Sequence, residues 1–450
     1  MPAAPSISAL DIIELQIGYT TILARYYKPV APRALVDGAR TGIAAELAAR
    51  GIDGTLPYTP AHVDLYGGGD LIAAMVFRSL ARYGAKLDAH RLVRAALGGE
   101  LAALHDPYSV LFFPQQFAKF NAFLGNEKTG GIGAIVSFVP AAGTASIDRV
   151  IPGGPAERAG LRPGDAIVAI DGRSIAEIGA SGVRDALRGK IGTAVRIDAT
   201  RAGERSAYAI VRAEIHDPQV AVARFGDIGY LALARFGDRA GSELGADLAG
   251  LQARGARAFV LDLRGNGGGF GDEATAVASA FIASGTIFTT RERDGTTTIS
   301  RAVGKADFHA PLVVLVDGDT ASAAEIVAGA LQDDRIATLV GTRTFGKGVV
   351  QSVYPLPDGS AFKVTTARYT TPKGRDIDRV GIAPDVVVEE PQDAKRGDPA
   401  TDPQLKAALD TLQAATKSAA ANDSGRAFDT PRTRIGAARG TSLPRSTAAR

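Results

Sequence analysis

From about Gly229 onward, short runs of apolar residues that resemble buried strands alternate with longer segments that have helical spacing. The strand-like runs are 230–236, 258–263 and 312–316, and helical patterns follow them as far as Ala253, Ala283 and Gln332. Such alternation is typical of an α/β unit, in which helices return the chain and cover a parallel or mixed sheet. The central fold expected for this chain is therefore an α/β core.

Between about Gly130 and Ile215 the pattern changes, because short β-rich runs are separated by glycine and other turn residues. These runs are GIGAIVSFV, SIDRVI, DAIVAIDG, AVRIDATR and AYAIVRAEI, and a helical stretch near 182–187 interrupts them. A separate β-rich domain is expected here.

The first hundred residues have apolar residues at spacings of three and four, which predicts helices. The segments with this spacing are Ile12 to Leu23, Ala34 to Leu47, Leu71 to Leu80 and Leu92 to Leu104. A weak repeat runs through them, since ARYYKPVAPRALVDGA from Ala24 matches ARYGAKLDAHRLVRAA from Ala81 at an offset of 57. We expect two similar helical hairpins that pack on each other or on a second copy of the chain, without catalytic groups.

The length of 450 residues is too great for one compact core and predicts roughly two to four domains. Hydrophobic residues make up 46% and charged residues 22%, as in ordinary folded proteins. Beyond about Gln392 the chain becomes rich in Ala, Ser, Thr, Pro and Arg, with one helical stretch from Asp402 to Thr416. The last 27 residues hold six arginines against one aspartate, so they account for more than the net charge of +3. We expect a solvated, disordered basic tail and a nearly neutral folded body with no nucleic-acid partner.

Several kinds of site are excluded by composition. The absence of cysteine rules out disulfides, thiolate metal sites and a cysteine nucleophile. The five histidines lack paired zinc-ligand spacings, so we expect no metal and no other cofactor. The N-terminus as given lacks the pattern of a signal peptide, and no later stretch approaches the ~18 apolar residues of a membrane span, so we expect no integral membrane segment.

Ser322 follows the strand-like run LVVLV and the turn DGD, and it precedes a segment with helical spacing. Free backbone N–H groups and the positive end of the helix dipole meet at such a helix start, which suits a nucleophile with an oxyanion hole. A serine at this position also serves as a simple helix cap. Both interpretations stay open on this feature alone.

Lys347 lies between two glycines in TRTFGKGVVQSV, and Gln351 follows four residues later. Residues at i and i+4 share a face in a strand as well as in a helix. A lysine acts as a base only when desolvation lowers its pKa, and a neighbouring amide can then orient the neutral amine. The alternative is a solvated surface lysine on a glycine turn.

A third feature is LDLRGNGGGF, in which a buried-looking strand runs into a glycine-rich turn at Gly265 to Gly269. Such a turn can present backbone N–H groups to an anion. It lacks the Gly-Lys-Ser/Thr ending of a phosphate loop, so nucleotide binding is not expected. A plain tight turn is the alternative.

Together these residues resemble the C-terminal processing peptidases, the tail-specific protease family with a serine–lysine catalytic pair. The resemblance covers about Asp106 to Glu390 and rests on seven motifs in the same order. They are DPYS at 106–109, GIGA at 131–134, PGGPAERAGLRPGDAIVAIDG, LDLRGNGGG, TASAAEIVAGALQD, TFGKGVVQ and GIAPDVVV.

The resemblance implies a role for individual residues. It assigns the nucleophile to Ser322, the base to Lys347 and the third catalytic residue to Gln351. The oxyanion donors would be the backbone N–H of Ala323 and of a glycine in the turn, with Gly268 the first choice and Gly267 the alternative. This sequence has glycine where many relatives have proline in that turn.

The β-rich segment resembles a PDZ domain, in which a peptide adds as a strand and its terminal carboxylate rests on backbone N–H groups. The matching carboxylate loop is Gly131, Ile132, Gly133 and Ala134. Ile132, Ile135 and Val136 are expected to shape a pocket for the last side chain of the peptide.

Asp333 and His309 are the other residues near Ser322 in the sequence to which a catalytic role could be assigned. Asp333 shares a helix face with Ser322, but at 1.5 Å per residue it lies ~16 Å along the axis, so we expect a structural role. His309 precedes the strand that leads to Ser322, and no histidine falls within a matching motif, so a serine–histidine triad is not expected.

The fold class expected overall is multidomain α+β. It comprises a helical N-terminal region (1–110), a PDZ domain (125–216), an α/β, ClpP/crotonase-like peptidase core (217–392), a helical C-terminal extension (393–420) and a disordered basic tail (421–450). The function implied is serine endopeptidase cleavage of polypeptides with free C-termini. A non-catalytic PDZ scaffold is the main alternative, and a structural role of the helical repeat is the third.

The resemblance also makes the helical N-terminus a candidate for homo-oligomer formation or for binding an adaptor protein. It further implies a periplasmic or other extracytoplasmic location. Neither expectation follows from residue spacing.

Overall fold

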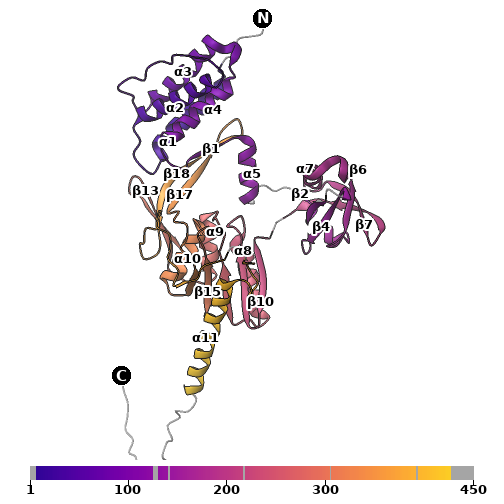
Figure 1. Cartoon of the computed structure of the whole chain (residues 1–450). Coiled ribbons are helices and arrows are strands. Elements are labelled where there is room, and N and C mark those ends of the chain that lie inside the picture. Colours follow the sequence, from indigo (N-terminus) through magenta and orange to yellow (C-terminus); the bar gives the residue numbers. More distant parts are fainter. Residues whose placement is uncertain are drawn as a thin grey trace, which may run out of the picture.

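The computed structural model describes residues 7–124, 130–139, 142–215, 218–304, 306–391 and 394–426. Figure 1 shows a helical N-terminal region, a β-rich domain set apart on one side, a central α/β core and a last helix that leaves the core toward the C-terminus. Of the tail predicted to be disordered (421–450), residues 427–450 lie outside the described residues, as does His216, whereas 421–426 form the end of the last helix.

The N-terminal region is a bundle of four α-helices whose apolar faces meet in one buried cluster. Its helices are α1 (Ala9–Arg25), α2 (Pro32–Ala48), α3 (Gly67–Tyr83) and α4 (Ala89–Ala102), with a 3-10 turn η1 (Gly84–Lys86). The repeated sequence spans the end of α1 and the start of α2, and again the end of α3 and the start of α4. The repeat is therefore present as two helix–loop–helix units, but the prediction of two hairpins was wrong, because the closest packing is between the units, with α4 against α2 and α1.

Small residues let α2 and α4 approach each other closely. A Cβ added at Gly42 would lie 2.0 Å from the carbonyl oxygen of Ala95, and one at Gly99 would lie 2.2 Å from that of Gly38. Side chains at these positions would force the two helices apart.

A five-stranded antiparallel sheet connects this bundle to the core. Its strands are β1 (Val110–Phe112), β13 (Thr286–Glu292), β14 (Thr297–Arg301), β17 (Val349–Pro355) and β18 (Ala361–Thr370). The far end of the β17–β18 hairpin reaches the bundle (Figure 1), where Leu356, Phe362 and Val364 join its apolar cluster. The near end of the hairpin lies beside the candidate site. Helix α5 (Pro114–Leu124) follows β1 and leads toward the β-rich domain.

The β-rich domain has its own core and a sheet in the order β3-β4-β5-β7-β8, with β6 on β5. Its elements are β2 (Gly130–Gly131), β3 (Ala134–Val139), β4 (Thr144–Val150), α6 (Pro155–Arg158), β5 (Ala166–Ile170), β6 (Arg173–Ser174), α7 (Ile175–Leu187), β7 (Ala194–Arg201), β8 (Glu204–Val211) and β9 (Ala213–Glu214). Helix α7 is longer than the predicted stretch, and Gly179 breaks it with a φ of 63°. Strand β3 is an edge strand beside α7, so one side of it is open for another strand.

The α/β core is built on a six-stranded sheet in the order β10-β11-β12-β15-β16-β19. Only the β10–β11 pair is antiparallel within it. Its strands are β10 (Val220–Phe225), β11 (Ile228–Leu233), β12 (Ala258–Asp262), β15 (Leu312–Val316), β16 (Ala337–Gly341) and β19 (Val386–Val387). The predicted α/β unit with a parallel or mixed sheet is thus confirmed, and the sheet is mixed.

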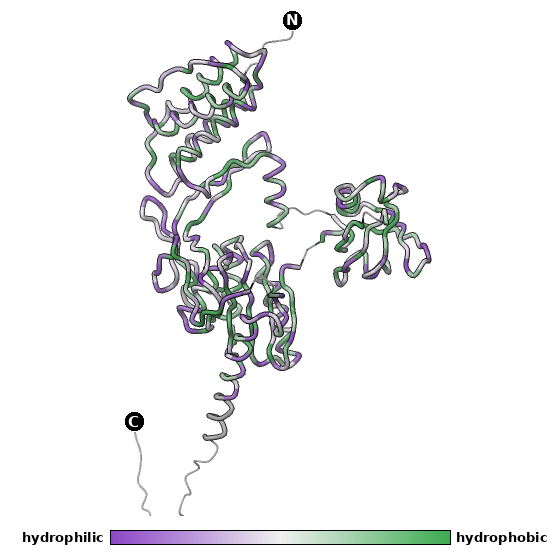
Figure 2. Tube along the Cα trace, viewed as in Figure 1, coloured by the Kyte–Doolittle hydropathy of each residue, from purple (hydrophilic) through white to green (hydrophobic). Residues whose placement is uncertain are grey.

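Helices cover both faces of this sheet because its central strands are buried on both sides. On one face, Phe259 and Val314 pack with α8 (Ala240–Ala253), α9 (Gly271–Ser279) and α10 (Ala323–Asp333). On the other face, Val260 and Val313 pack with α11 (Pro403–Arg426). The buried residues of α11 have helical spacing and are Leu405, Ala408, Leu409 and Leu412. Figure 2 shows the same burial as apolar segments in the interior of the core.

Candidate active site

Ser322 lies after the carboxyl end of β15 and immediately before α10, at the edge where ligands of parallel sheets usually bind. Its backbone has φ 58° and ψ −117°, a conformation that non-glycine residues rarely adopt. The residue is partly exposed, whereas Ala321 and Ala323 on either side of it are buried. A strained, accessible serine at a helix start is the geometry in which a nucleophile is presented.

The carboxylate of Glu325 joins the Ser322 segment to the Lys347 segment. Its Oε2 accepts the backbone N–H groups of Ser322 and of Lys347, each at 2.9 Å. Its Oε1 accepts the Gly346 N–H at 2.7 Å and the Thr344 hydroxyl at 2.5 Å. Because Glu325 is fully buried, these hydrogen bonds fix the two segments relative to each other.

Lys347 lies in the loop before β17, and its Nζ is 5.2 Å from the centre of the Tyr108 ring. Burial, followed by the positive charge of Lys363, lowers the pKa of Lys347 from 10.5 to about 8. The carboxylates of Glu325 and Asp106 oppose this shift without reversing it. A lysine with such a pKa is partly neutral near pH 8, as a general base must be.

Gln351 does not meet Lys347 in the way the spacing predicted. Lys347 precedes the first residue of β17, Val349, and the strand register shifts between Val350 and Gln351. Because Lys347 lies outside the strand, the alternation of faces on which the i, i+4 prediction depended does not reach it, and the extra residue at the register shift, Thr366, belongs to β18. The Gln351 amide Nε2 instead lies 3.5 Å from the Thr365 hydroxyl, and within the described ranges no hydrogen bond links the side chains of Ser322, Lys347 and Gln351.

The glycine-rich turn lies directly against Ser322. A Cβ at Gly268, which has a φ of 95°, would lie 2.8 Å from the Cβ of Ser322 and 2.9 Å from the nitrogen of Ala323. The Gly268 N–H donates to Oδ1 of Asn266 at 2.9 Å, so it is occupied in this arrangement. The N–H groups of Ala323 and Gly267 have no partner among the described residues. The candidate oxyanion donors therefore lie together. The N–H groups of Ala323 and Gly267 are free to bind an oxyanion, whereas that of Gly268 is already hydrogen-bonded.

Two further buried residues position the same groups, and the sequence analysis did not assign them a role. The Asn266 side chain donates from Nδ2 to the carbonyl of Leu233 at 2.7 Å. The backbone carbonyl of Asn266 accepts the Ala321 N–H at 2.9 Å. Tyr369 donates its hydroxyl to the carbonyl of Ser322 at 3.1 Å. Asn266 lies within the glycine motif and Glu325 lies three residues after Ser322, in the Ser-x-x-Glu pattern of a capping box, but no local signal points to Tyr369.

In the β-rich domain, the predicted carboxylate loop connects β2 to β3. Gly131 pairs with Ala213, and the carbonyls of Ile132 and Gly133 accept backbone N–H groups of α6 and of the residue after β4. The N–H groups of Ile132 and Gly133 form no hydrogen bond with another described residue, so they are available to an anion. Gly133 has a φ of 74°, and Ala134 begins the edge strand β3.

The pocket expected next to this loop is shaped differently from the prediction. Ile132 is only 2% exposed and belongs to the domain core, while Ile135 is 38% exposed. Val136 packs against the core next to α7, because side chains alternate along β3. Ile135 therefore points away from the domain core, and of the two residues only Val136 points toward the core on the side of α7.

The alternative residues lie away from Ser322. Asp333 ends the continuous helix α10 and pairs with Arg375 at 2.6 Å, which agrees with the structural role predicted for it. His309 pairs with Asp307 at 2.9 Å and precedes β15, so the length of this strand separates it from Ser322. Within the described ranges, no group of three or more His, Asp or Glu side chains is placed to hold a metal ion, and no helix is long and apolar enough to cross a membrane.

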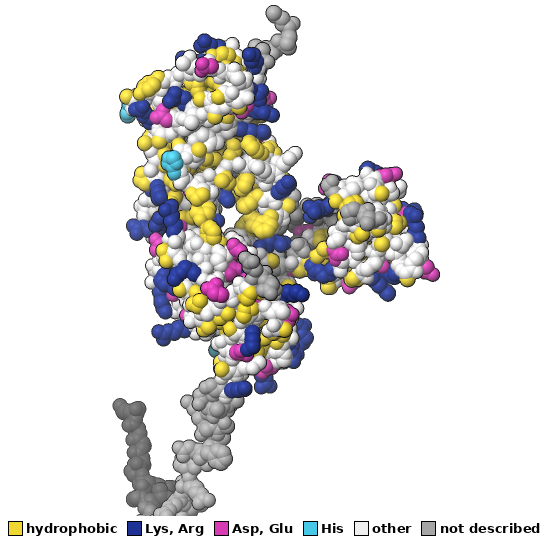
Figure 3. Space-filling view, in the orientation of Figure 1, with side chains coloured by type: hydrophobic (Ala, Val, Ile, Leu, Met, Phe, Trp, Pro, Cys, Tyr) yellow, Lys and Arg dark blue, Asp and Glu magenta, His cyan; other side chains and the backbone are white. Residues whose placement is uncertain are grey.

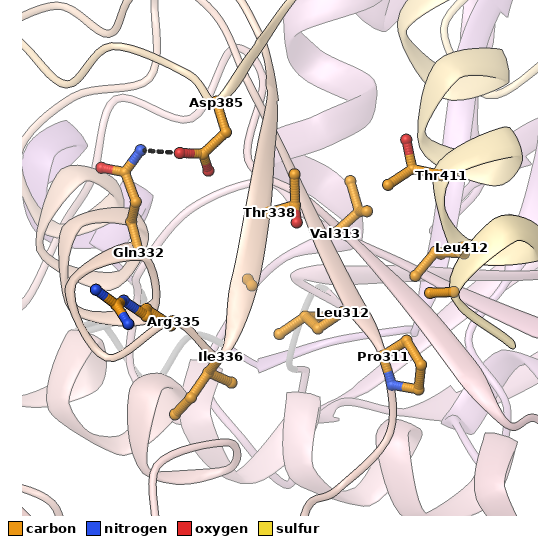
Figure 4. A pocket seen from close by; sticks show the side chains of 12 residues that line it. Pro311, Leu312, Val313, Gln332, Arg335, Ile336, Thr338, Asp385, Thr411 and Leu412 are labelled. Atoms are coloured by element: carbon orange, nitrogen blue, oxygen red, sulfur yellow. Dashed lines mark hydrogen bonds between the residues drawn. The ribbon is translucent and has the colours of Figure 1, made fainter. Parts of the chain in front are cut away.

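A cavity of about 340 Å³ lies between α11, the end of α10 and the first residues of β15 and β16 (Figure 4). Its walls include Leu312 and Leu412, and Gln332 bonds to Asp385 at its rim. It opens at the amino ends of the strands, whereas Ser322 follows the carboxyl end of β15.

On the face seen in Figure 3, apolar side chains gather near α5, where Phe113 and Phe123 are 43% and 59% exposed.

Comparison with known proteins gives a consistent result. The family model for peptidase family S41 matches residues 227–388, and the PDZ domain model matches residues 146–201. A carboxyl-terminal-processing protease of Picosynechococcus is 38% identical over 325 residues, which cover 70% of this chain and 78% of that protein. The carboxy-terminal processing protease CtpA of Bacillus subtilis is 34% identical over 316 residues, covering 70% and 67%. The solved photosystem II D1 C-terminal processing protease is 26% identical, with a TM-score of 0.46 and coverage of 86% and 96%.

Proposed function

Since the chain belongs to the carboxyl-terminal-processing proteases, serine-type peptidases of family S41 with a PDZ domain, we propose that it cleaves polypeptides with Ser322 as nucleophile and Lys347 as general base. The observation that supports this most is the shared Glu325 carboxylate, which holds the Ser322 and Lys347 segments side by side.

In the first chemical step, neutral Lys347 accepts the hydroxyl proton of Ser322 while Oγ attacks the scissile carbonyl. The tetrahedral intermediate collapses to an acyl-enzyme, and the Lys347 ammonium returns the proton to the leaving amine. Water then hydrolyses the ester by the same route. The low pKa of Lys347 supports this role, because an ordinary lysine would be almost fully protonated at neutral pH.

The developing oxyanion needs two N–H donors close to Ser322. Ala323 supplies one, as its N–H is free among the described residues. Gly268 is the first choice for the other because it lies against Ser322, but its N–H must leave Asn266. Gly267, with a free N–H, is the alternative. Gln351 is assigned the orientation of the neutral Lys347 amine, for which its side-chain amide must leave the Thr365 hydroxyl.

The PDZ domain captures the C-terminal tail of the substrate. The tail adds to the free edge of β3, and its carboxylate rests on the N–H groups of Ile132 and Gly133. The loop Gly131 to Ala134 thus selects chains by their free end, and cleavage follows in the core. A location outside the cytoplasm, an adaptor protein and a homo-oligomer are further predictions that rest on the family resemblance.

Proteolysis of an unfolded protein tests the catalytic assignment. Casein should be cleaved by the wild-type chain and left intact by Ser322→Ala and by Lys347→Ala, while both variants still bind a tail peptide in fluorescence anisotropy. Casein cleavage by either variant would refute the assigned residue. Inactivity of the wild type with intact peptide binding would favour the non-catalytic scaffold.

A further inference from the structure

The C-terminal segment, residues 394–402, returns to the core and contacts the two turns that form the candidate site. Two ion pairs make this contact, and the basic partner belongs to the core in one pair and to the C-terminal segment in the other. In one, Arg264 of the core meets Asp402 of the segment, and in the other, Asp317 of the core meets Arg396 of the segment. Neither Arg396 nor Asp402 has a role in the proposed chemistry.

The first pair is completely buried. The guanidinium of Arg264, which directly precedes the glycine-rich turn, binds Asp262 at 2.6 Å and Asp402 at 2.8 Å. Asp402 also accepts the N–H groups of Gly397 and Leu405, so the same carboxylate caps α11. Removing either partner would leave an uncompensated charge in the interior, so this pair is part of the fold itself.

The second pair, Arg396 with Asp317, is more exposed than the first. Arg396 NH2 lies 2.7 Å from Oδ2 of Asp317, a carboxylate whose side chain is 8% exposed, while the side chain of Arg396 is 40% exposed. Glu390 lies against the same guanidinium at 2.5 Å. Loss of the Arg396 head group therefore removes the charge partner of Asp317 without opening the core.

Asp317 links the glycine-rich turn, Gly265–Gly269, to the loop that carries Ser322. Both of its carboxylate oxygens accept the Gly265 N–H at 3.0 Å, and Oδ1 also accepts the N–H of Thr320 at 2.9 Å. The Thr320 hydroxyl donates to the carbonyl of Leu263 at 2.9 Å. Gly268 and Ser322, which must be aligned for an oxyanion hole, each lie only a few residues from these bonds.

We propose that Arg396 is a positioning residue for catalysis, which aligns the Gly265–Gly269 turn with the Ser322 loop through Asp317. This inference rests on the proposed function for its catalytic consequence. A misplacement of about 1 Å can reduce turnover by roughly a hundredfold without a change in substrate binding. The C-terminal segment is thus a working part of the active site as well as a structural support.

The chain provides a closely matched control. Arg375 is 39% exposed and pairs at 2.6 Å with Asp333, whose side chain is 4% exposed. This pair lies at the opposite end of α10 from Ser322. Arg375→Met and Arg396→Met therefore each remove a partly exposed guanidinium from a buried aspartate and from one further partner, Gln332 or Glu390, but only the second pair lies next to the site.

The test combines kinetics with local hydrogen–deuterium exchange of the full chain. On a fluorogenic peptide that spans a casein cleavage site, Arg396→Met should lower kcat at least tenfold with KM within threefold of the wild type. Arg375→Met should stay within twofold in kcat, and Arg396→Lys should recover part of the loss. Exchange measured by mass spectrometry should rise in 263–269 and 317–323 only for the Arg396 variant.

Two outcomes would overturn the inference. One is equal kcat for Arg396→Met and Arg375→Met, and the other is unchanged exchange in both segments of Arg396→Met. The exchange measurement does not depend on catalysis, so it still decides whether Arg396 orders the turns if Ser322→Ala proves active. In that case the proposed function fails, and the positioning of the turns is judged separately.

Discussion

The backbone N–H groups of Ser322 and Lys347 donate to the same atom, Oε2 of Glu325, at 2.9 Å each. This shared acceptor brings together two segments that are far from each other along the chain. It also means that the alignment of nucleophile and base depends on a group that touches neither reacting atom. The first prediction follows from that dependence.

Glu325→Gln should lower kcat by at least tenfold, because the new amide NH2 would face backbone donors and could not accept from them. Peptide binding to the PDZ domain should stay unchanged in fluorescence anisotropy. Glu273→Gln serves as a control, since Glu273 also accepts two backbone N–H groups, from Arg239 and Gly241, but not at the site. Equal activity of the two variants would contradict the role given to Glu325.

The pH dependence of kcat/KM should show that the positive charge of Lys363 lowers the pKa of Lys347. Activity should rise with pH through the pKa of Lys347, about 8, because only the neutral amine accepts a proton. Lys363→Gln removes a like charge, so it should raise that pKa and move the rising limb to higher pH. Lys363→Arg keeps the charge and should leave the limb in place. A limb that does not move in Lys363→Gln would show that this repulsion is negligible.

Gly268→Ala should abolish most activity, by roughly a hundredfold or more in kcat, as loss of an oxyanion donor does. An added Cβ would lie 2.7 Å from the carbonyl oxygen of Ala321, and the φ of 95° disfavours any side chain. Gly271→Ala is the control, because its Cβ would meet Phe288 only at an ordinary 3.6 Å. Thermal unfolding of both variants should separate a local effect from loss of fold. Full activity of Gly268→Ala would place the oxyanion hole elsewhere.

Val136→Thr should weaken binding of a peptide with an apolar C-terminal residue several-fold, because its hydroxyl would face the groove next to α7. Ile135→Thr, one position earlier on the opposite face of β3, should bind like the wild type. Fluorescence anisotropy with a labelled peptide measures both. A larger loss in Ile135→Thr would reverse the assignment of the two faces.

Glu100→Gln should raise the melting temperature of the helical region at pH 8. Glu100 is fully buried without a hydrogen-bond partner among the described residues, and burial raises its pKa well above 4.5. Because the pKa of Glu100 is higher in the folded state than in the unfolded state, its contribution to the free energy of unfolding is greatest below about pH 4.5. This contribution is lost as the pH rises through the folded-state pKa. The stabilisation by the substitution should therefore shrink at pH 5. The control is Asp53→Asn, which changes an exposed carboxyl of the same region, and a gain in Glu100→Gln that does not depend on pH would contradict this account.

The sequence by itself determined the secondary structure and the order of the domains. The spacing of apolar residues predicted the four N-terminal helices and the α/β alternation, because these patterns are local consequences of helix and strand geometry. Residue types and motif order likewise pointed to Ser322, Lys347 and the glycine turn. The i, i+4 spacing did not reveal how the Gln351 side chain lies, because Lys347 is in the loop before β17, where strand alternation does not apply, and the Gln351 amide lies near Thr365.

Only the tertiary structure decided how these residues are held. Glu325, Tyr369 and Lys363 act on the site across strand and helix boundaries, and Arg396 and Asp402 reach Asp317 and Arg264 from 79 and 138 residues away. Local periodicity carries no information on such contacts, because they depend on how separate elements pack. The chemistry at Ser322 and Lys347 was therefore visible in the sequence, while the alignment of the two residues was decided by buried hydrogen bonds between distant segments.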